Sequence, residues 1–235
     1  MSRRRIETLK PRTNRSSREF EKSSSKRYSC LCFDYPQKHE LGTIAIYGNR
    51  ARVVIDYDAH HGNGTQAAFL NDERVAFLSA HQWGIYPGTG WIEDAPHARK
   101  RIVNVPLPAY AGDKVYEQVA DRVFAPFVES FKPQMIFISV GFDAHWNDPI
   151  TTLGLSTAGY FTLAKKVLAL AEEYCDSKIV FVLEGGYDPL NVANGAEAVF
   201  IAAIGKGSID AGDPNPNKEP DCESRIDEIR KWHGF

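Results

Sequence analysis

The chain has 235 residues, of which 43% are hydrophobic and 25% charged, and its formal net charge is −2. These values are typical of one soluble globular domain with a sizeable core, and no apolar run is long enough to cross a bilayer. The four cysteines, Cys30, Cys32, Cys175 and Cys222, form no Cys-x-x-Cys pair, and nothing resembles a secretory apolar segment. We therefore expect reduced thiols in an intracellular protein, cytoplasmic or nuclear, that makes no membrane contact.

Charge is distributed unevenly along the chain. The first 27 residues hold ten Lys or Arg against three Glu, a net charge of +7, which leaves −9 for the rest. Because this segment has few apolar residues, it is predicted to be a disordered basic arm (1–27) ahead of a single domain (28–235). The acidic body suits a cationic substrate. The arm could contact nucleic acid, although its charge alone favours a simply solvated arm, so nucleic acid is expected only through this arm.

Strand and helix patterns alternate from residue 52 onward. Aromatic residues in 28–35 and 44–47 suggest two short strands without clear flanking signals. Regular β-rich runs follow at 52–57, 74–80, 101–105, 134–140 and 178–183. Helical periodicity is present at 113–131, with an interruption at Pro126, and at 156–174, 193–204 and 222–232. This alternation predicts a three-layer αβα fold with a mostly parallel sheet.

The polar stretch DYDAHHGNG (56–64) directly follows the first of these regular strands. Side chains two apart on an extended segment share a face, so Asp58 and His60 could bind one cation, with Asp56 on the same face. The simpler interpretation is a polar strand end followed by a glycine-rich turn.

Other strand ends also carry polar residues, and ligands of open α/β sheets bind at the carboxyl ends of the strands. Asp143 follows one strand, and together with Asp58 and His60 it would complete a hydrolytic zinc site with open positions. Tyr187 follows two glycines after another strand, where its hydroxyl could donate to a developing oxyanion. Taken singly, Asp143 could cap a turn, Tyr187 could close a loop, and His81 or His145 could be structural. Taken together, they favour a metal hydrolase.

Four spaced motifs carry a resemblance to a known family. They are DYDAHHGNGTQ (56–66), YPGTG (86–90), GFDAH with the following Asp-Pro (141–149), and LEGGYD (183–188). From about residue 52 to 204 the chain resembles the histone deacetylase superfamily, in particular its class II enzymes and the histone-deacetylase-like and acetylpolyamine amidohydrolases. This resemblance implies an arginase/deacetylase-like fold.

The resemblance also implies roles for individual residues. Asp58, His60 and Asp143 match the zinc ligands, and Tyr187 matches the tyrosine that polarises the acetyl carbonyl. A structural monovalent cation, usually potassium, is expected at Asp56, Ser79 and Ala80. A second such cation is expected at backbone oxygens of Phe69, Asp72, Val75 and Arg101. Along the substrate path the resemblance places Tyr86, Gly185 and Gly186, and it places His61 beside the metal ligands.

The chain departs from the family pattern at its N-terminal side. The family has a tandem His-His in a Pro-Gly-His-His-Ala setting, followed by a Gly-Phe-Cys segment, upstream of the first motif. Residues 1–50 contain neither, and their one histidine is His39. Because that tandem transfers protons, we expect a form truncated at its N-terminal side and impaired in catalysis. The missing strands would also expose a sheet edge, which residues 28–50 or a protein partner would have to cover.

Two functions remain open. One is a zinc-dependent amidohydrolase acting on acetyl-lysine or an acetylated polyamine. The other is a non-catalytic metal-binding scaffold for an acylated ligand or a protein partner. An arginase-like manganese enzyme is less well supported, because a two-metal site needs more carboxylates at these strand ends.

Overall fold

The computed structural model describes residues 51–205, 207, 209 and 214–235. Five strands form one sheet in the order β3-β2-β1-β4-β5, and every neighbouring pair is parallel. The strands are β1 (Arg52–Asp56), β2 (Val75–Gln82), β3 (Ile102–Leu107), β4 (Ile136–Val140) and β5 (Ile179–Leu183). The five predicted strands are thus confirmed. The basic arm and the strands expected within 28–50 lie outside the described residues.

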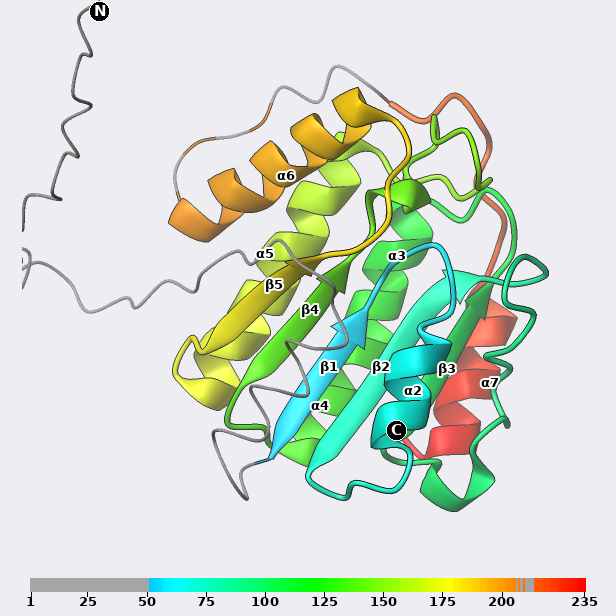
Figure 1. The fold of residues 1–235 in the computed structure, drawn as a ribbon, viewed down its shortest axis with the longest axis vertical. Helices are drawn as coiled ribbons and strands as arrows, with labels where there is room; N and C mark the ends of the chain where they lie inside the picture. The colour runs from blue at the N-terminus through cyan, green and yellow to red at the C-terminus, as the bar shows by residue number, and fades with distance from the viewer. Residues whose placement is uncertain (1–50, 206, 208, 210–213) are drawn as a thin grey trace, which may run out of the picture.

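Helices connect the strands (Figure 1). They are α2 (Asn63–Phe69), α3 (Asp113–Val119), α4 (Ala125–Phe131), α5 (Thr157–Cys175), α6 (Pro189–Ile204) and α7 (Glu223–His233). A π-helical segment, η2 (Ala120–Phe124), joins α3 to α4, and short 3-10 turns lie at η1 (Pro96–Ala98) and η3 (Phe142–Ala144). None of the helices in the described part of the chain is long and apolar enough to cross a membrane.

The helices differ from the predictions in three places. The predicted interruption near Pro126 appears as the π-helical segment η2 directly before it, while the chain stays helical throughout, because proline has no N–H to donate to an α-helical ladder. Helix α6 begins at Pro189 rather than at residue 193, since the Asp188 carboxylate caps it by accepting from Leu190 N and Asn191 N at 2.9 Å. Helix α2 was not predicted, because its seven residues include Gly64 and show too little periodicity.

Apolar side chains on the two faces of the sheet belong to two separate clusters. Val53 and Ile55 of β1 join the larger cluster with residues of α3, α4, α5 and α7, whereas Val54 joins a smaller one with Phe69 of α2. Figure 1 shows α2 in front of β2, with α3, α4 and α5 behind the sheet. Helices therefore flank both faces, as the predicted αβα arrangement requires, because alternate strand residues point to opposite faces.

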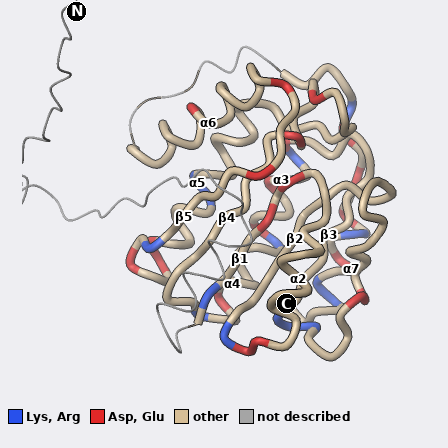
Figure 2. Tube along the Cα trace, viewed as in Figure 1, with Lys and Arg blue, Asp and Glu red and all other residues tan. Residues whose placement is uncertain are grey.

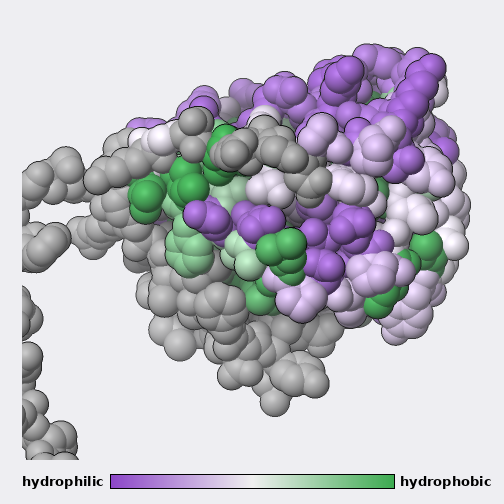
Figure 3. Space-filling model, turned by 90° about the horizontal axis from the view of Figure 1, so that it is seen from above, coloured by the Kyte–Doolittle hydropathy of each residue, from purple (hydrophilic) through white to green (hydrophobic). Residues whose placement is uncertain are grey.

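All five strands end at the same edge of the sheet. In the charge-coloured view the trace turns acidic where β1 ends (Figure 2), and the last residue of β1 is Asp56. Seen from above, the described surface at this end is mostly hydrophilic, with scattered hydrophobic side chains (Figure 3). The exposed large apolar residues include Trp83, Tyr86, Ile150 and Tyr187. The loops that follow β1, β2, β4 and β5 therefore bring the predicted site residues to one edge.

Candidate metal centre

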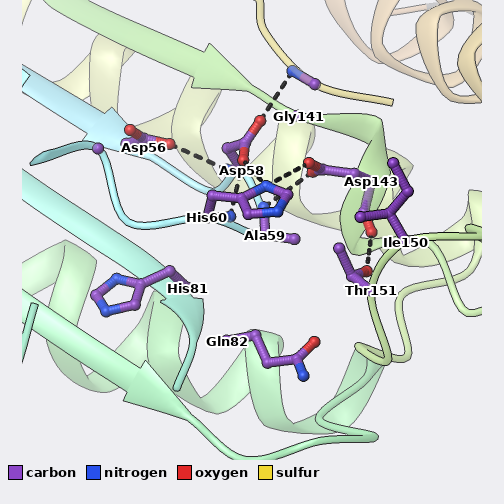
Figure 4. Close-up of polar contacts among 12 residues, drawn as sticks. Asp56, Asp58, Ala59, His60, His81, Gln82, Gly141, Asp143, Ile150 and Thr151 are labelled. Carbon is purple, nitrogen blue, oxygen red and sulfur yellow. Dashed lines mark hydrogen bonds and ion pairs between the residues drawn. The ribbon is translucent and has the colours of Figure 1, made fainter. Parts of the chain in front are cut away.

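Asp58, His60 and Asp143 point toward one another (Figure 4). His60 Nδ1 lies 3.1 Å from Asp58 Oδ1 and 2.9 Å from Asp143 Oδ2. One potential ligand atom from each residue lies within 4.8 Å of the others. Asp143 is fully buried, and the His60 side chain is 20% exposed, so the cluster opens to solvent on the His60 side.

A bend in the backbone, rather than a pleated strand, produces this convergence. Strand β1 ends at Asp56, and the two following turns are closed by side chains. Asp56 Oδ1 accepts from Asp58 N at 3.0 Å, and Asp58 Oδ1 accepts from His60 N at 2.8 Å. Asp143, on η3 after β4, accepts from Ala59 N at 2.9 Å. The expectation that Asp58 and His60 share a strand face is therefore wrong, although their side chains do meet.

Two glycines make room for the carboxylates. A Cβ on Gly141 would lie 2.2 Å from Asp58 Oδ2, and a Cβ on Gly185 would lie 2.3 Å from Asp143 Oδ2. Gly185 N also donates to Asp58 Oδ2 at 2.8 Å. Since real Cβ contacts are almost never shorter than 3.0 Å, any side chain at either position would displace the carboxylates.

The surroundings shift the pKa values of His60 and Asp143. Hydrogen bonds to Asp143 and then Asp58 raise the pKa of His60 to about 10. Burial raises the pKa of Asp143 to about 6, against the opposing effect of its bond with His60. A proton on His60 thus lies between the carboxylates in the metal-free chain. A divalent cation would replace that proton, and one nitrogen with two oxygen donors is a set that fits zinc.

A cavity of about 380 Å³ opens beside these residues. It is lined by Asp56, Asp58, His60, His61, Gly62, Asn63, Gly64, Thr65, Tyr86, Glu184, Gly185 and Tyr187. The centroids of the Tyr86 and Tyr187 rings lie 6.5 and 6.4 Å from that of His60. Both tyrosines therefore stand where a ligand would pass on its way to the cluster.

The Gly-Gly-Tyr turn is held by a residue to which the sequence assigned no role. The Asp148 carboxylate accepts from Tyr187 N at 3.0 Å, which fixes the backbone that carries the phenol. Partial burial, and then the charges of the nearby carboxylates, raise the pKa of Tyr187, so its hydroxyl remains a donor. Gly185 lines the cavity, as expected, whereas Gly186 has a φ of 133° and packs toward Val192.

The expected potassium ligands lie close together. Asp56 of β1 pairs with Ser79 of β2 in the parallel register, Ala80 follows it, and all three are buried. Ser79 Oγ lies 3.0 Å from Nδ1 of His81, whose Nε2 faces the Gly90 carbonyl oxygen at 3.1 Å. Ser79 Oγ also accepts from Gly62 N at 3.4 Å, and His81 Nδ1 lies 3.2 Å from the Ser79 carbonyl oxygen, so both oxygens of Ser79 already have protein partners.

A side chain contacts part of the second expected cation site. The Arg101 guanidinium donates to Phe69 O at 2.7 Å, to Val75 O at 3.0 Å and to Leu70 O. Two of the carbonyl oxygens expected to bind a cation therefore accept from this arginine. Because a guanidinium already supplies positive charge at this position, these contacts do not favour a second cation, and the expectation stays a prediction.

His61 faces away from the three ligands. Its Nδ1 lies 2.8 Å from Thr89 Oγ1, its Nε2 lies 3.0 Å from Gln66 Oε1, and its ring centroid lies 4.8 Å from that of His81. Burial lowers the pKa of His61. The sequence offered no signal for Thr89 or Gln66 as its partners. The two histidines considered structural, His81 and His145, make local hydrogen bonds, His145 accepting from Asn147 N at 3.2 Å.

Comparisons with known proteins agree with this geometry. Residues 43–203 match the family described as the histone deacetylase domain. The chain is 40% identical over 186 residues to histone deacetylase 14, chloroplastic, of Arabidopsis thaliana, covering 75% of this chain and 44% of that protein. It is 48% identical over 136 residues to a probable deacetylase of Archaeoglobus fulgidus, covering 57% of this chain and 38% of that protein.

Further relatives extend the comparison to an amidohydrolase and to solved structures. A histone deacetylase-like amidohydrolase of Pseudomonas aeruginosa is 37% identical over 153 residues, covering 61% of this chain and 40% of that protein. The structure of the histone deacetylase Clr3 superposes with a TM-score of 0.69 at 30% identity, covering 78% of this chain and 31% of that one. The chain thus spans less than half the length of these curated relatives. Because the family model matches most of this chain and the fold is shared with a solved deacetylase, the chain belongs to the histone deacetylase superfamily.

Proposed function

We propose that this chain is a zinc-dependent amidohydrolase that acts on acetyl-lysine or an acetylated polyamine, and that its catalysis is weak. The observation that carries the proposal is the cluster of Asp58, His60 and Asp143 beside a cavity walled by Tyr187. The relatives described as deacetylases and as an amidohydrolase support the reaction class.

The chain's own residues account for most of the chemistry. Zinc held by Asp58, His60 and Asp143 would supply Lewis-acid activation of a water molecule and of the acyl carbonyl. The Tyr187 hydroxyl, with its raised pKa, donates a hydrogen bond to the oxygen that becomes negatively charged during attack. Asp148 keeps that phenol in place through the backbone, and Tyr86 confines the acyl chain.

Proton transfer is the step for which no residue is evident. Among the described residues that line the cavity the only histidines are His60, a proposed metal ligand, and His61, whose two nitrogens face Thr89 and Gln66. Loss of a general acid-base group typically costs about 10²- to 10⁴-fold in rate. Turnover by these 235 residues alone is therefore expected to be far below that of a complete site.

The alternative is a metal-binding scaffold that holds an acylated ligand or a protein partner without turnover. The lack of an evident proton-transfer residue among the described residues that line the cavity favours it. The presence of Tyr187 favours the enzyme, because a scaffold has no need of an oxyanion donor.

Zinc content and peptide turnover separate the two functions. Elemental analysis is expected to find about one zinc per chain, less in Asp143→Ala, and an unchanged amount in the matched control His145→Ala. Slow deacetylation of an acetyl-lysine peptide that increases with pH and falls in Tyr187→Phe would support the enzyme. Zinc and acylated-peptide binding without turnover would support the scaffold. Equal zinc content in wild type and Asp143→Ala would refute the metal assignment.

A further inference from the structure

Tyr86, the proposed wall of the acyl-chain path, lies on a long irregular loop between β2 and β3. Its side chain is 78% exposed, yet its ring lies 6.5 Å from that of His60. The loop, rather than packing around Tyr86 itself, must therefore hold this ring beside the cavity. The anchors of the loop decide how well Tyr86 is placed.

Buried polar groups beneath the loop provide those anchors. His81 Nε2 lies 3.1 Å from Gly90 O, and the Asp94 carboxylate accepts from Gly90 N and Trp91 N at 2.7 and 2.9 Å. Asn104 Nδ2 donates to Trp91 O at 3.2 Å. These bonds fix the end of the loop, four and five residues after Tyr86.

Nearer to Tyr86, the side-chain anchor is His61. Its Nδ1 lies 2.8 Å from Thr89 Oγ1, three residues after Tyr86. Because Nε2 faces the side-chain amide oxygen Oε1 of Gln66 at 3.0 Å, Nε2 donates and Nδ1 accepts from the Thr89 hydroxyl. His61 is only 4% exposed and lies against His81, so its ring has little freedom to move.

Gly90 shows how closely the loop is seated on these rings. Its φ is 93°, and a Cβ at this position would lie 2.5 Å from His81 Nε2 and 2.7 Å from His61 Cγ. The loop backbone thus rests directly on the His61 and His81 rings. A change in either ring would be transmitted to the loop.

We propose that His61 is a positioning residue that ties the Tyr86 loop to the metal-ligand segment through the Thr89 hydroxyl. His60 and His61 are adjacent in the chain, so one histidine binds at the proposed metal centre while the next sets the distance to the opposite wall. The link to acyl recognition rests on the proposed function, whereas the anchoring of the loop does not.

Thr89 is the better place for the test, because Thr89→Val removes the hydroxyl with little change in shape and Thr89→Ser restores it. Backbone hydrogen exchange of residues 84–91, followed by mass spectrometry, reports loop opening whether or not the protein is an enzyme. Affinity of the zinc-loaded chain for a fluorescent acetyl-lysine peptide reports recognition, with the unacetylated peptide as background. Glu93→Gln, an exposed change on the same loop, serves as the matched control.

Thr89→Val is expected to increase exchange in 84–91 and to weaken peptide binding, each about five-fold, with zinc content unchanged. Thr89→Ser should restore most of the exchange protection and of the peptide affinity. His61→Asn, which keeps an acceptor near the Nδ1 position, should retain most of both. Wild-type exchange in Thr89→Val would overturn the proposal. If even the wild type does not bind the acetylated peptide, the proposed function fails, and the exchange result still decides the role of His61.

Discussion

Gly185 lies against both carboxylates of the candidate metal centre, so Gly185→Ala tests the geometry of that centre without relying on turnover. A Cβ here would lie 2.3 Å from Asp143 Oδ2 and 2.6 Å from Asp58 Oδ2. To restore the 3.0 Å below which real Cβ contacts essentially never fall, the Asp143 oxygen must move by about 0.7 Å. Metal-ligand distances tolerate shifts of only about 0.2 Å.

The alanine should therefore weaken zinc binding by about 10- to 100-fold, the range typical when the support of a ligand is disturbed. Gly185 does not have a positive φ, so the substitution adds a steric contact without straining the backbone. Titration of metal-free protein with zinc, in competition with a chromophoric chelator, measures the change, and thermal unfolding checks that the variant folds.

Gly205→Ala is the control, because φ at Gly205 is 64° and nothing lies within 4 Å of a Cβ placed there. It should lower stability by about 1 kcal/mol through backbone strain and leave zinc affinity unchanged. Wild-type zinc affinity in a folded Gly185→Ala protein would refute the assignment of these carboxylates as ligands.

Three further predictions concern ions, pH and the guanidinium site. Potassium should raise the melting temperature more than a large organic cation at equal ionic strength, and Asp56→Asn should abolish the difference; an equal response in both proteins would argue against this ion site. Burial lowers the pKa of His233 from 6.5 to about 4, so the stability linked to its neutral form is complete above pH 6.5 and is lost as the pH falls toward 4. That loss is about 3 kcal/mol. In His233→Asn, which keeps a donor, the free energy of unfolding measured in urea should therefore fall less between pH 6.5 and pH 4. Arg101→Met leaves backbone carbonyl groups within 69–75 without their donor and should cost about 2 kcal/mol, clearly more than loss of the exposed ion pair in Arg74→Met. Equal unfolding free energies of the two variants would contradict this role of Arg101.

The sequence by itself determined the parallel αβα fold, the family and the candidate ligand set. Each strand is a short β-rich run that can be identified locally, and parallel strands bring their carboxyl ends to one edge. Asp58, Asp143 and Tyr187 follow different strands, so the fold class alone predicts that they approach one another. The structure places Asp58 and Tyr187 on one cavity and Asp143 next to Asp58 and His60, while their roles in binding and catalysis remain proposals.

Only the tertiary structure decided how those residues meet and what surrounds them. The bend after Asp56 depends on carboxylates that accept from backbone N–H groups, one of them from the distant Asp143. Arg101 reaches a carbonyl 32 residues earlier, and His61 meets Thr89 28 residues later. Such contacts join segments far apart in the chain. Because they depend on long-range packing and not on local periodicity, no sequence pattern predicts them.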